Sequence, residues 1–503
     1  MGRQFSLALG SALLLVLAFP SLNQPWAAWI GLVPWLLLLP GLRPRAAFWW
    51  SYLVGVLFFL GSIWWLVHVT VLGWLILCAF LALYFGVFGV IANRSYTAHP
   101  TPHTRLLLLP AAWVALEYIR SHLFTGFGWN LLGYSQTPWP MVLQIADLTG
   151  AWGISAVIVL VNASIAECLN RFTTRHSPAN TVVTIGIATG VFVSVMGYGA
   201  WRLPGKVAPA WRIAVVQGNI PQAHKWDDAY TEQILATYER LTHQAAGHQP
   251  QLIVWPETAV PGFLDSDERL TQHVFGIARS VHRPLLVGAP TLKFRLEGEQ
   301  TFNSAALVTP SGEIPQQYHK VHLVPFGEFI PFEHTAPWLR HLLPPIGDFW
   351  SGRDYTVFRS EGQLPFSVLI CFEDVFPTLA RQFVQRGARA LLVITNDGWF
   401  GPTAAAYQHA QASTLRAVEL RVPVARAANT GWSGCIDPWG RWTARVQDPT
   451  GHELFTEGFQ ACDLPTGPGP TLYQRWGDWF ALVCGILPTL WLAVSSYRTI
   501  TAK

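Results

Sequence analysis

The stretch FSVLICFED, residues 366–374, places reactive side chains at the end of an apolar run. Phe366–Ile370 is short and mostly apolar, as is typical of a buried strand. A thiol, Cys371, and two carboxylates, Glu373 and Asp374, follow it directly. The stretch therefore predicts a buried β-strand whose carboxyl end carries potentially reactive groups.

Similar short runs recur on both sides of this stretch and alternate with helix-like segments. The strand-like runs are RIAVVQ (212–217), LIVW (252–255), PLLV (284–287), AALV (305–308), ALLVI (390–394) and VARA (424–427). Helix-like segments include Tyr230–Gln244 and Ala404–Glu419. This alternation predicts an α/β fold in which helices are layered on sheets.

Two more reactive side chains lie near strand-like runs: Glu257 follows LIVW, and Lys320 lies in HKVHLVPFGE. Each residue alone has an ordinary explanation, because such a glutamate or lysine is usually solvated and such a cysteine is usually in the core. Together with Cys371 they supply a nucleophile, a carboxylate base and a cation that could favour thiolate and stabilise an oxyanion. The set predicts nucleophilic catalysis.

The chain as a whole is unusually apolar. Hydrophobic residues make up 51% of its 503 residues and charged residues 12%, about half the charged share of soluble domains. This composition argues against a disordered chain or an ordinary soluble protein. Apolar runs predict about eight membrane-spanning helices, several of them near the roughly 20 residues that a bilayer requires. They are Phe5–Phe19, Trp26–Leu39, Ala47–Val67, Leu72–Ala92, Leu106–Tyr118, Trp152–Leu169, Val182–Ala200 and Trp476–Val494.

Charges in the short loops predict how these spans are oriented. With the N-terminus in the cytoplasm, nine basic residues fall on the inner side and three on the outer side, which fits the positive-inside rule. The inner ones are Arg3, Arg43, Arg45, Arg94, Arg105, Arg171, Arg175, Arg498 and Lys503, and the outer ones are Arg120, Arg202 and Lys206. We predict a membrane domain over residues 1–206, an extracytoplasmic domain over 207–470, and a last span with a cytoplasmic tail over 471–503.

Glu117 and Glu167 lie within or at the ends of predicted spans. An ionisable side chain is costly there and therefore hints at function. For Glu167, a position at a span end beside Arg171, from which it could reach the polar surface, is the simpler explanation.

Several kinds of site are not expected. A net charge of +4 is too small for a nucleic-acid-binding face. The six cysteines contain no CxxC pair, so neither a disulfide framework nor a zinc site is indicated. The sequence has no GxSxG, P-loop, HExxH or GxGxxG motif. We therefore expect no metal and no cofactor.

The residues around the three reactive side chains resemble a known set. Glu257 in WPET, Lys320 in HKVHLVPFGE and Cys371 in ICFED, followed by NTGWSGCIDPWG (429–440), are similar to the Glu-Lys-Cys set of the nitrilase superfamily. That resemblance implies an α-β-β-α sandwich that attacks nitriles, amides or acyl groups through a cysteine adduct. A domain of this kind inserted between membrane spans resembles the apolipoprotein N-acyltransferases, as do FTGFGWNLLGYSQ (124–136), VQGNIP (216–221) and NDGWFG (396–401).

The resemblance implies roles residue by residue. Cys371 would be the nucleophile, Glu257 the general base and Lys320 the positioning and oxyanion-stabilising cation. Glu328 would support the site, and the remaining matched residues, near the acyl and head-group path, are Trp226, Glu373, Asn396 and Trp399. Phe372 departs from the tyrosine of many members, which could alter how the nucleophile loop is held.

The implied reaction is a ping-pong acyl transfer in the bacterial inner membrane, with the catalytic domain on the periplasmic side. Cys371 would take an acyl chain from a phospholipid, phosphatidylethanolamine, and pass it to the α-amino group of an apolipoprotein's diacylglyceryl-cysteine. The alternatives are a Cys–His protease dyad using His319 or His322, a membrane-tethered amidase or nitrile hydrolase, and a non-catalytic transporter or scaffold.

The segment 337–350, PWLRHLLPPIGDFW, is too apolar for a solvated loop and too rich in proline for a stable helix. A buried core segment is one explanation. The other is an arm at the lipid surface that opens to admit the two lipid substrates in turn.

Overall fold

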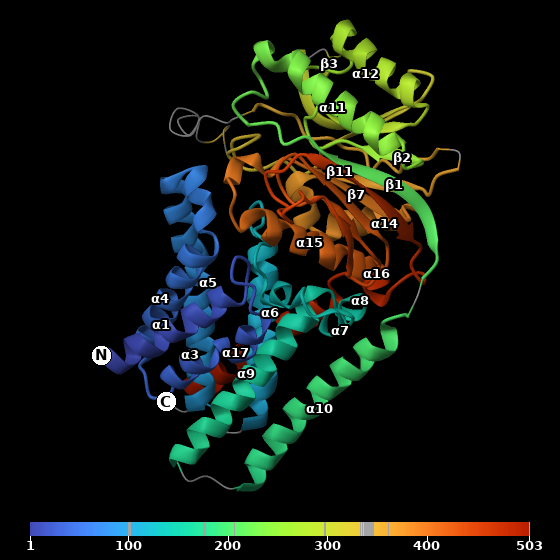
Figure 1. The fold of residues 1–503 in the computed structure, drawn as a ribbon. Helices are drawn as coiled ribbons and strands as arrows, with labels where there is room; N and C mark the ends of the chain where they lie inside the picture. The colour runs from blue at the N-terminus through green and yellow to red at the C-terminus, as the bar shows by residue number, and fades with distance from the viewer. Residues whose placement is uncertain are drawn as a thin grey trace. The chain divides into compact units, whose positions relative to one another are not determined.

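A computed structural model describes residues 1–98, 102–174, 178–205, 207–295, 298–331, 333, 335, 347–360 and 362–501 of the chain (Figure 1). The chain forms two compact units. The first contains Met1–Gly205, Thr403–Gln411 and Thr471–Lys503, and the second contains Lys206–Pro402 and Ala412–Pro470.

The first unit is helical. Its long helices are α1 (Gly2–Leu17), α4 (Pro44–Ser62), α5 (Val71–Ala98), α6 (Pro102–His122), α9 (Ala151–Thr174), α10 (Pro178–Arg202) and α17 (Trp479–Thr501). Its short helices are η1 (Pro25–Ala27), α2 (Ala28–Gly31), α3 (Val33–Leu38), η2 (Trp64–His68), η3 (Leu132–Gln136), α7 (Pro140–Leu143), α8 (Ala146–Thr149) and α16 (Leu472–Trp476). Each of the eight predicted runs therefore contains helix.

Four of the described helical segments are long and apolar enough to cross a membrane, which makes the unit a polytopic membrane domain. They are Pro44–Ser62, Val71–Tyr96, Ala151–Asn170 and Thr181–Arg202. The other predicted spans are less clear for physical reasons. Helix α6 carries Arg105, Glu117 and Arg120, and the second run is broken between α2 and α3, where Pro34 lies in the first turn of α3.

Polar side chains of α9 serve the interior of this unit. Asn162 accepts a hydrogen bond from the backbone of Leu32, at the α2–α3 break, at 2.8 Å. Glu167 is buried and accepts two hydrogen bonds from Arg105, at 2.8 and 3.0 Å. Glu167 is therefore buried and paired with α6, which does not fit the explanation that it reaches for the polar surface.

The second unit contains two sheets. The six-stranded sheet has the order β11-β1-β2-β3-β4-β5, and the five-stranded sheet has the order β10-β9-β8-β7-β6. Pairs β1–β2, β2–β3, β6–β7 and β7–β8 are parallel and the others antiparallel. The strands are β1 (Pro209–Gln217), β2 (Leu252–Val254), β3 (Leu285–Arg295), β4 (Gly298–Val308), β5 (Gln316–His319), β6 (Phe366–Ile370), β7 (Ala390–Thr395), β8 (Val424–Ala428), β9 (Gly434–Ile436), β10 (Trp442–Arg445) and β11 (Gly458–Pro465).

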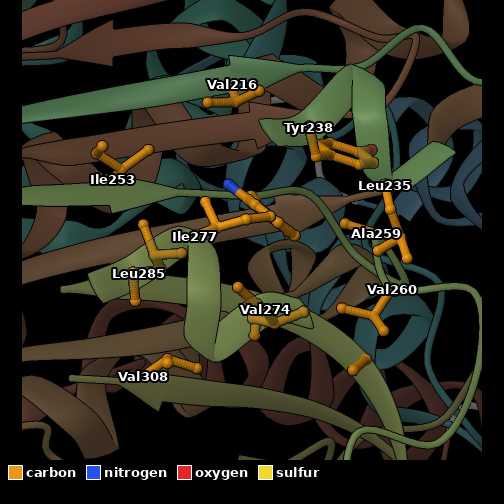
Figure 2. Close-up of a cluster of buried hydrophobic side chains, with 14 of the residues drawn as sticks. Val216, Leu235, Tyr238, Ile253, Ala259, Val260, Val274, Ile277, Leu285 and Val308 are labelled. Atoms are coloured by element: carbon orange, nitrogen blue, oxygen red, sulfur yellow. The ribbon is translucent and has the colours of Figure 1, made fainter. Parts of the chain in front are cut away.

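Helices α11 (Thr231–Ala246) and α12 (Glu268–Val281) pack on the six-stranded sheet (Figure 2). Tyr238 of α11 and Val274 of α12 are fully buried with Val216, Ile253 and Leu285 of the strands. The remaining elements are α14 (Pro377–Gln385), α15 (Ala405–Leu420), η4 (Asp228–Tyr230), η5 (Cys371–Val375) and η6 (Asp397–Phe400). The α/β alternation predicted from the sequence is therefore present.

The two sheets are in contact. Trp211 of β1 stacks on Phe366 of β6 with ring centroids 5.4 Å apart. A disulfide joins Cys435 of β9 to Cys462 of β11. The expectation of no disulfide was therefore wrong at this pair. Its two cysteines lie 27 residues apart, and only the contact between the sheets, which leaves no local sequence pattern, brings them together.

Candidate active site

The ends of three strands carry the predicted catalytic residues. Glu257 lies three residues after β2, Lys320 directly follows β5, and Cys371 directly follows β6 as the first residue of η5. Cys371 has φ = 55°, a left-handed conformation that costs free energy in a non-glycine residue and is often found at functional sites. The thiol therefore sits on a sharp turn from strand to helix.

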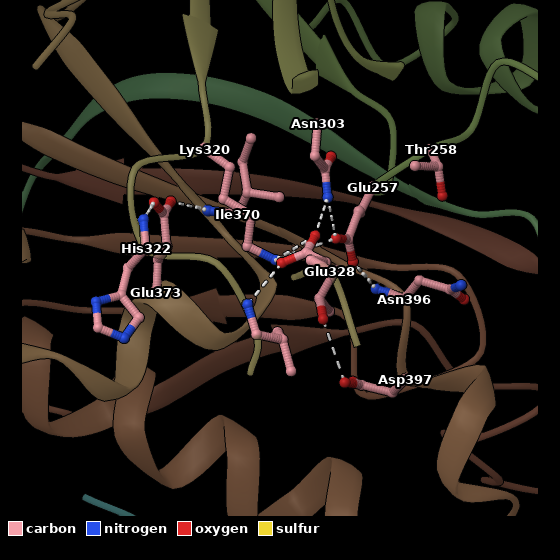
Figure 3. Close-up of polar contacts among 12 residues, drawn as sticks. Glu257, Thr258, Asn303, Lys320, His322, Glu328, Ile370, Glu373, Asn396 and Asp397 are labelled. Carbon is pink, nitrogen blue, oxygen red and sulfur yellow. Dashed lines mark hydrogen bonds and ion pairs between the residues drawn. The ribbon is translucent and has the colours of Figure 1, made fainter. Parts of the chain in front are cut away.

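Glu257 is held by two hydrogen bonds to its carboxylate (Figure 3). Asn303 of β4 donates through Nδ2 to Oε1 at 2.7 Å, and the backbone nitrogen of Asn396 donates to Oε2 at 2.8 Å. The side chain is 8% exposed. A buried carboxylate fixed at both oxygens is well oriented for proton transfer.

Lys320 lies between two carboxylates. Its Nζ is 2.9 Å from Glu328 Oε2 and 3.7 Å from Glu257 Oε1, and its side chain is 1% exposed. Asn303 donates to Glu328 as well as to Glu257. Burial alone would lower the pKa of Lys320, but the carboxylates of Glu328 and Glu257 outweigh it and raise that pKa above its ordinary value. Lys320 is therefore a fixed positive charge.

Cys371 interacts electrostatically with Glu257 and Lys320, and its side chain hydrogen-bonds with Thr395. Burial raises the pKa of the thiol, the Glu257 carboxylate raises it further, and Lys320 opposes both. The net direction is upward. Lys320 favours the thiolate, as expected from the sequence, but it does not outweigh burial, so the resting group is a thiol that needs a base.

Glu373 supports the turn rather than the charged cluster. Its carboxylate accepts hydrogen bonds from the backbone nitrogens of Val321, His322 and Ile370 at 2.7, 3.0 and 2.8 Å, and from the Tyr318 hydroxyl at 2.8 Å. It therefore ties the segment after Lys320 to the end of β6 (Figure 3). Burial raises the pKa of Glu373 to about 7.

The alternative bases, His319 and His322, have other partners. His319 Nδ1 is 2.7 Å from the Ser304 hydroxyl. The His322 ring packs on Phe376 with centroids 3.7 Å apart, and Phe372 also packs on Phe376 at 5.0 Å. Phe372 thus belongs to an aromatic cluster beside the nucleophile.

The other matched residues divide into two groups. Asn396 contacts Glu257 through its backbone and donates its side-chain amide to Gln222 Oε1 at 2.7 Å. Trp226 is 54% exposed and Trp399 is half-buried in η6. Within the described residues, neither tryptophan ring hydrogen-bonds to the Glu257 cluster, so only Asn396 is part of it.

Residues 337–346 of the predicted arm lie outside the described residues. Trp350, at the end of that segment, is 48% exposed, and its backbone nitrogen donates to the Thr301 carbonyl at 2.8 Å. Over the ranges that the structure covers, no group of three or more His, Cys, Asp or Glu side chains is placed to hold a metal ion.

Sequence reasoning missed three groups around the site. Asn303, described above, lies near the middle of β4 next to another polar residue, so no local pattern marks it. Lys225 donates from a buried position to the Glu257 carbonyl at 2.8 Å and the Thr258 hydroxyl at 2.7 Å. Arg426 lies in the VARA run, which the sequence predicts only as a buried strand. In β8 it pairs with Asp374 and Asp397, at 3.0 and 3.1 Å.

Comparison with known proteins supplies the family. Residues 11–164 match the model of the apolipoprotein N-acyltransferase N-terminal domain, and residues 212–456 match the carbon-nitrogen hydrolase model. Apolipoprotein N-acyltransferase from Geobacter metallireducens is 36% identical over 498 residues, which cover 96% of this chain and 93% of that protein. The enzyme of the same name from Chlorobaculum tepidum is 31% identical over 96% of this chain and 95% of its own length. The chain belongs to the apolipoprotein N-acyltransferase family.

As a member of this family, the chain is an acyltransferase of lipoprotein biosynthesis, and its second unit is a nitrilase-like domain. The hydrolase and scaffold alternatives therefore give way to acyl transfer. Among solved structures, an amidase from Nesterenkonia sp. matches with a TM-score of 0.39 and 23% identity, over 54% of this chain and 95% of that chain.

Proposed function

We propose that the enzyme transfers an acyl chain from phosphatidylethanolamine to the α-amino group of an apolipoprotein's N-terminal diacylglyceryl-cysteine, through a thioester on Cys371. The observation that carries the proposal is the arrangement of Glu257. Its carboxylate is buried, fixed by Asn303 and Asn396, and coupled electrostatically to the Cys371 thiol. Lys320 lies 3.7 Å away as a permanent cation.

In the first half-reaction Glu257 takes the proton of the Cys371 thiol as the sulfur attacks the ester carbonyl of the phospholipid. Lys320 stabilises the negative charge that develops on the carbonyl oxygen. The ester C–O bond then breaks, and the proton held by Glu257 goes to the glycerol oxygen of the departing lysophospholipid. Because burial keeps Cys371 protonated at rest, this base is required.

In the second half-reaction the α-amino group of the apolipoprotein attacks the thioester. Glu257 removes a proton from the attacking nitrogen, the C–S bond breaks, and the proton passes to the Cys371 sulfur. The products are an amide and the free thiol. Water must not compete with the amine for the thioester. As the resemblance to the family implies, we assign the exposed Trp226 and the half-buried Trp399 to the acyl and head-group path.

We further propose that the enzyme has eight spans in the inner membrane and a periplasmic α-β-β-α sandwich over residues 207–470. Helix in all eight apolar runs supports the span count, and nine basic residues against three support the orientation. The Cys435–Cys462 disulfide supports an oxidising compartment for the second unit. Helices packed on the first sheet, and the contact between the sheets, support the sandwich.

A membrane location suits this chemistry. Both substrates carry acyl chains, and withdrawing a chain from the bilayer costs roughly 0.8 kcal/mol per exposed CH₂. An enzyme anchored in the same bilayer avoids that cost.

The test is a single-turnover assay with the full-length enzyme in nanodiscs. Phosphatidylethanolamine with labelled acyl chains is expected to leave a hydroxylamine-sensitive label on the peptide that contains Cys371. Adding a diacylglyceryl-cysteine peptide should move the label to the peptide's α-nitrogen. Release of labelled free fatty acid in place of transfer would contradict the proposal, and label retained from phosphatidylglycerol but not phosphatidylethanolamine would correct the donor.

A further inference from the structure

Two buried lysines flank Glu257 in different ways. Lys320 approaches its carboxylate, whereas Lys225 approaches its backbone. Lys225 Nζ donates to the Glu257 carbonyl at 2.8 Å and to the Thr258 hydroxyl at 2.7 Å, and the residue is 2% exposed. Across the described residues, no carboxylate lies within ion-pair distance of Lys225, whereas Lys320 has two.

The turn that Lys225 holds is tight. Thr258 has φ = 46°, which is unfavourable for a β-branched residue. The turn also presses on β3, because a Cβ added at Gly288 would lie 2.2 Å from the Pro256 carbonyl oxygen and 2.7 Å from the Glu257 Cα. A strained turn persists only where its surroundings fix it, and the two hydrogen bonds from Lys225 provide such a fixation directly at the base.

Opposing effects set the pKa of Lys225. Burial lowers its pKa to about 7, although the Glu257 carboxylate and, more weakly, Cys371 oppose the shift. A lone buried ammonium is costly, so this group gains and loses its charge near neutrality. Lys320 stays charged because its two carboxylates outweigh burial. Environments that drive the pKa values of two neighbouring groups apart are typical of acid and base sites.

We propose that Lys225 is a positioning residue of acyl transfer, which holds the Glu257–Thr258 turn and places a second cation beside the Glu257–Cys371 pair. This inference rests on the base role proposed for Glu257. Among the described residues, the titratable groups that interact with Lys225 are Glu257 after β2 and Cys371 after β6, and the Glu257 carboxylate in turn lies 3.7 Å from Lys320, which pairs with Glu328. Loss of the Lys225 charge above neutral pH removes an attraction that favours the Glu257 carboxylate and the Cys371 thiolate.

The experiment compares Lys225→Met with Lys293→Met, a lysine of β3 that lies over the Phe302 ring and contacts no site residue in the described structure. Methionine is similar in length and removes the charge together with both hydrogen bonds that Lys225 donates. For Lys225→Met we expect kcat of acylation to fall roughly tenfold with KM changed by less than about twofold. The pH profile of the parent should flatten above pH 7, and this inflection should vanish in Lys225→Met but not in Lys293→Met.

Two further variants keep the test decisive. Lys225→Arg keeps a charge at every pH, so it should recover part of kcat without the inflection near pH 7. Thr258→Ala removes one acceptor and leaves the lysine, so kcat should fall about threefold even if Lys225→Met unfolds. Parent-like kcat and pH profile in both Lys225→Met and Thr258→Ala would overturn the inference. Retained acylation in Glu257→Gln would instead overturn the base role on which it rests.

Discussion

The two sheets of the nitrilase-like unit contribute different chemistry to the site. The six-stranded sheet brings the charges, since Glu257 follows β2 and Lys320 follows β5. The five-stranded sheet brings Cys371 after β6 and the backbone amide of Asn396 after β7, while Arg426 of β8 is paired with aspartates. Under the proposed roles, proton transfer and nucleophilic attack are divided between the sheets, so the site depends on their contact as much as on either sheet.

The largest effect should follow from removing the nucleophile of the five-stranded sheet. Cys371→Ser replaces the thiol with a hydroxyl that is far harder to ionise, so acylation from labelled phospholipid should fall by about 10⁴-fold or more. Cys168→Ser, at a cysteine of the membrane unit that is not part of the disulfide, is the matched control and should acylate at the parent rate. A parent-like rate in Cys371→Ser would place the nucleophile elsewhere.

Removing the base of the six-stranded sheet should come next. Glu257→Gln keeps the shape and the contacts of one oxygen but cannot accept a proton, so both half-reactions should slow by about 10³-fold. Single-turnover acylation and transfer to a peptide acceptor measure them separately. Glu313→Gln, an exposed glutamate of the same sheet's β4–β5 connection, should leave both rates unchanged. Slowing of only one half-reaction would restrict Glu257 to that step.

Exchanging the cation tests whether charge alone suffices. Lys320→Arg keeps the charge but puts a planar guanidinium where a compact ammonium contacts Glu257 and Glu328. The rate of acylation should therefore remain about 10²-fold below that of the parent. Lys293→Arg is the control outside the site. Full activity in Lys320→Arg would show that the geometry at Lys320 is not specific.

A smaller effect should come from Glu373, which joins the segment after β5 to the end of β6. The pKa of this group rises from 4.5 to about 7 on folding, so between those values the folded protein holds a proton that the unfolded chain has lost. Stability should therefore fall as pH rises from 5 to 7. In thermal melts across this range, Glu373→Gln should show a flatter dependence, and an equally steep one would contradict the assignment.

The smallest effect on catalysis should come from the disulfide between the sheets. Cys462→Ser removes a cross-link between residues 27 positions apart, which costs about 3.5 kcal/mol of stability in the chain-entropy model. Acylation at 25 °C should stay within about twofold of the parent while the melting temperature drops. A large loss of kcat without a change in melting would mean that the link itself positions the site.

The sequence predicted the site where the signal was local. Glu257 and Cys371 follow apolar strands, and the motifs around Glu257, Lys320 and Cys371 resembled one family. The roles of Asn303 and Lys225 were not predictable, because their contacts with Glu257 depend on how separate strands and loops meet. The same holds for Cys435 and Cys462, which no local pattern pairs.

In the membrane unit, sequence patterns located helices but did not establish how many of them span the membrane. The apolar runs located eight regions that contain helix, but among the described residues length and hydropathy identify only four of them clearly as spans. Internal prolines mark the weaker ones: Pro110 lies within α6 and Pro488 within α17. Hydropathy is averaged over a window of residues. It therefore does not register single contacts, such as the hydrogen bond that Asn162 accepts at the break between α2 and α3 or the ion pair between Arg105 and Glu167.

The pairing of β1 with β11 also determines how long one edge of β1 stays unpaired during biosynthesis. Gln217 of β1 lies opposite Gly458 of β11, so 458 − 217 = 241 residues must be made before this edge of β1 is covered. At roughly 5–20 residues per second, that takes about 12–48 s, during which an apolar strand edge, the kind that recruits other chains, stays open. The nascent enzyme therefore needs protection for about half of its synthesis. A chain cut short before β11 should aggregate rather than yield a smaller active domain.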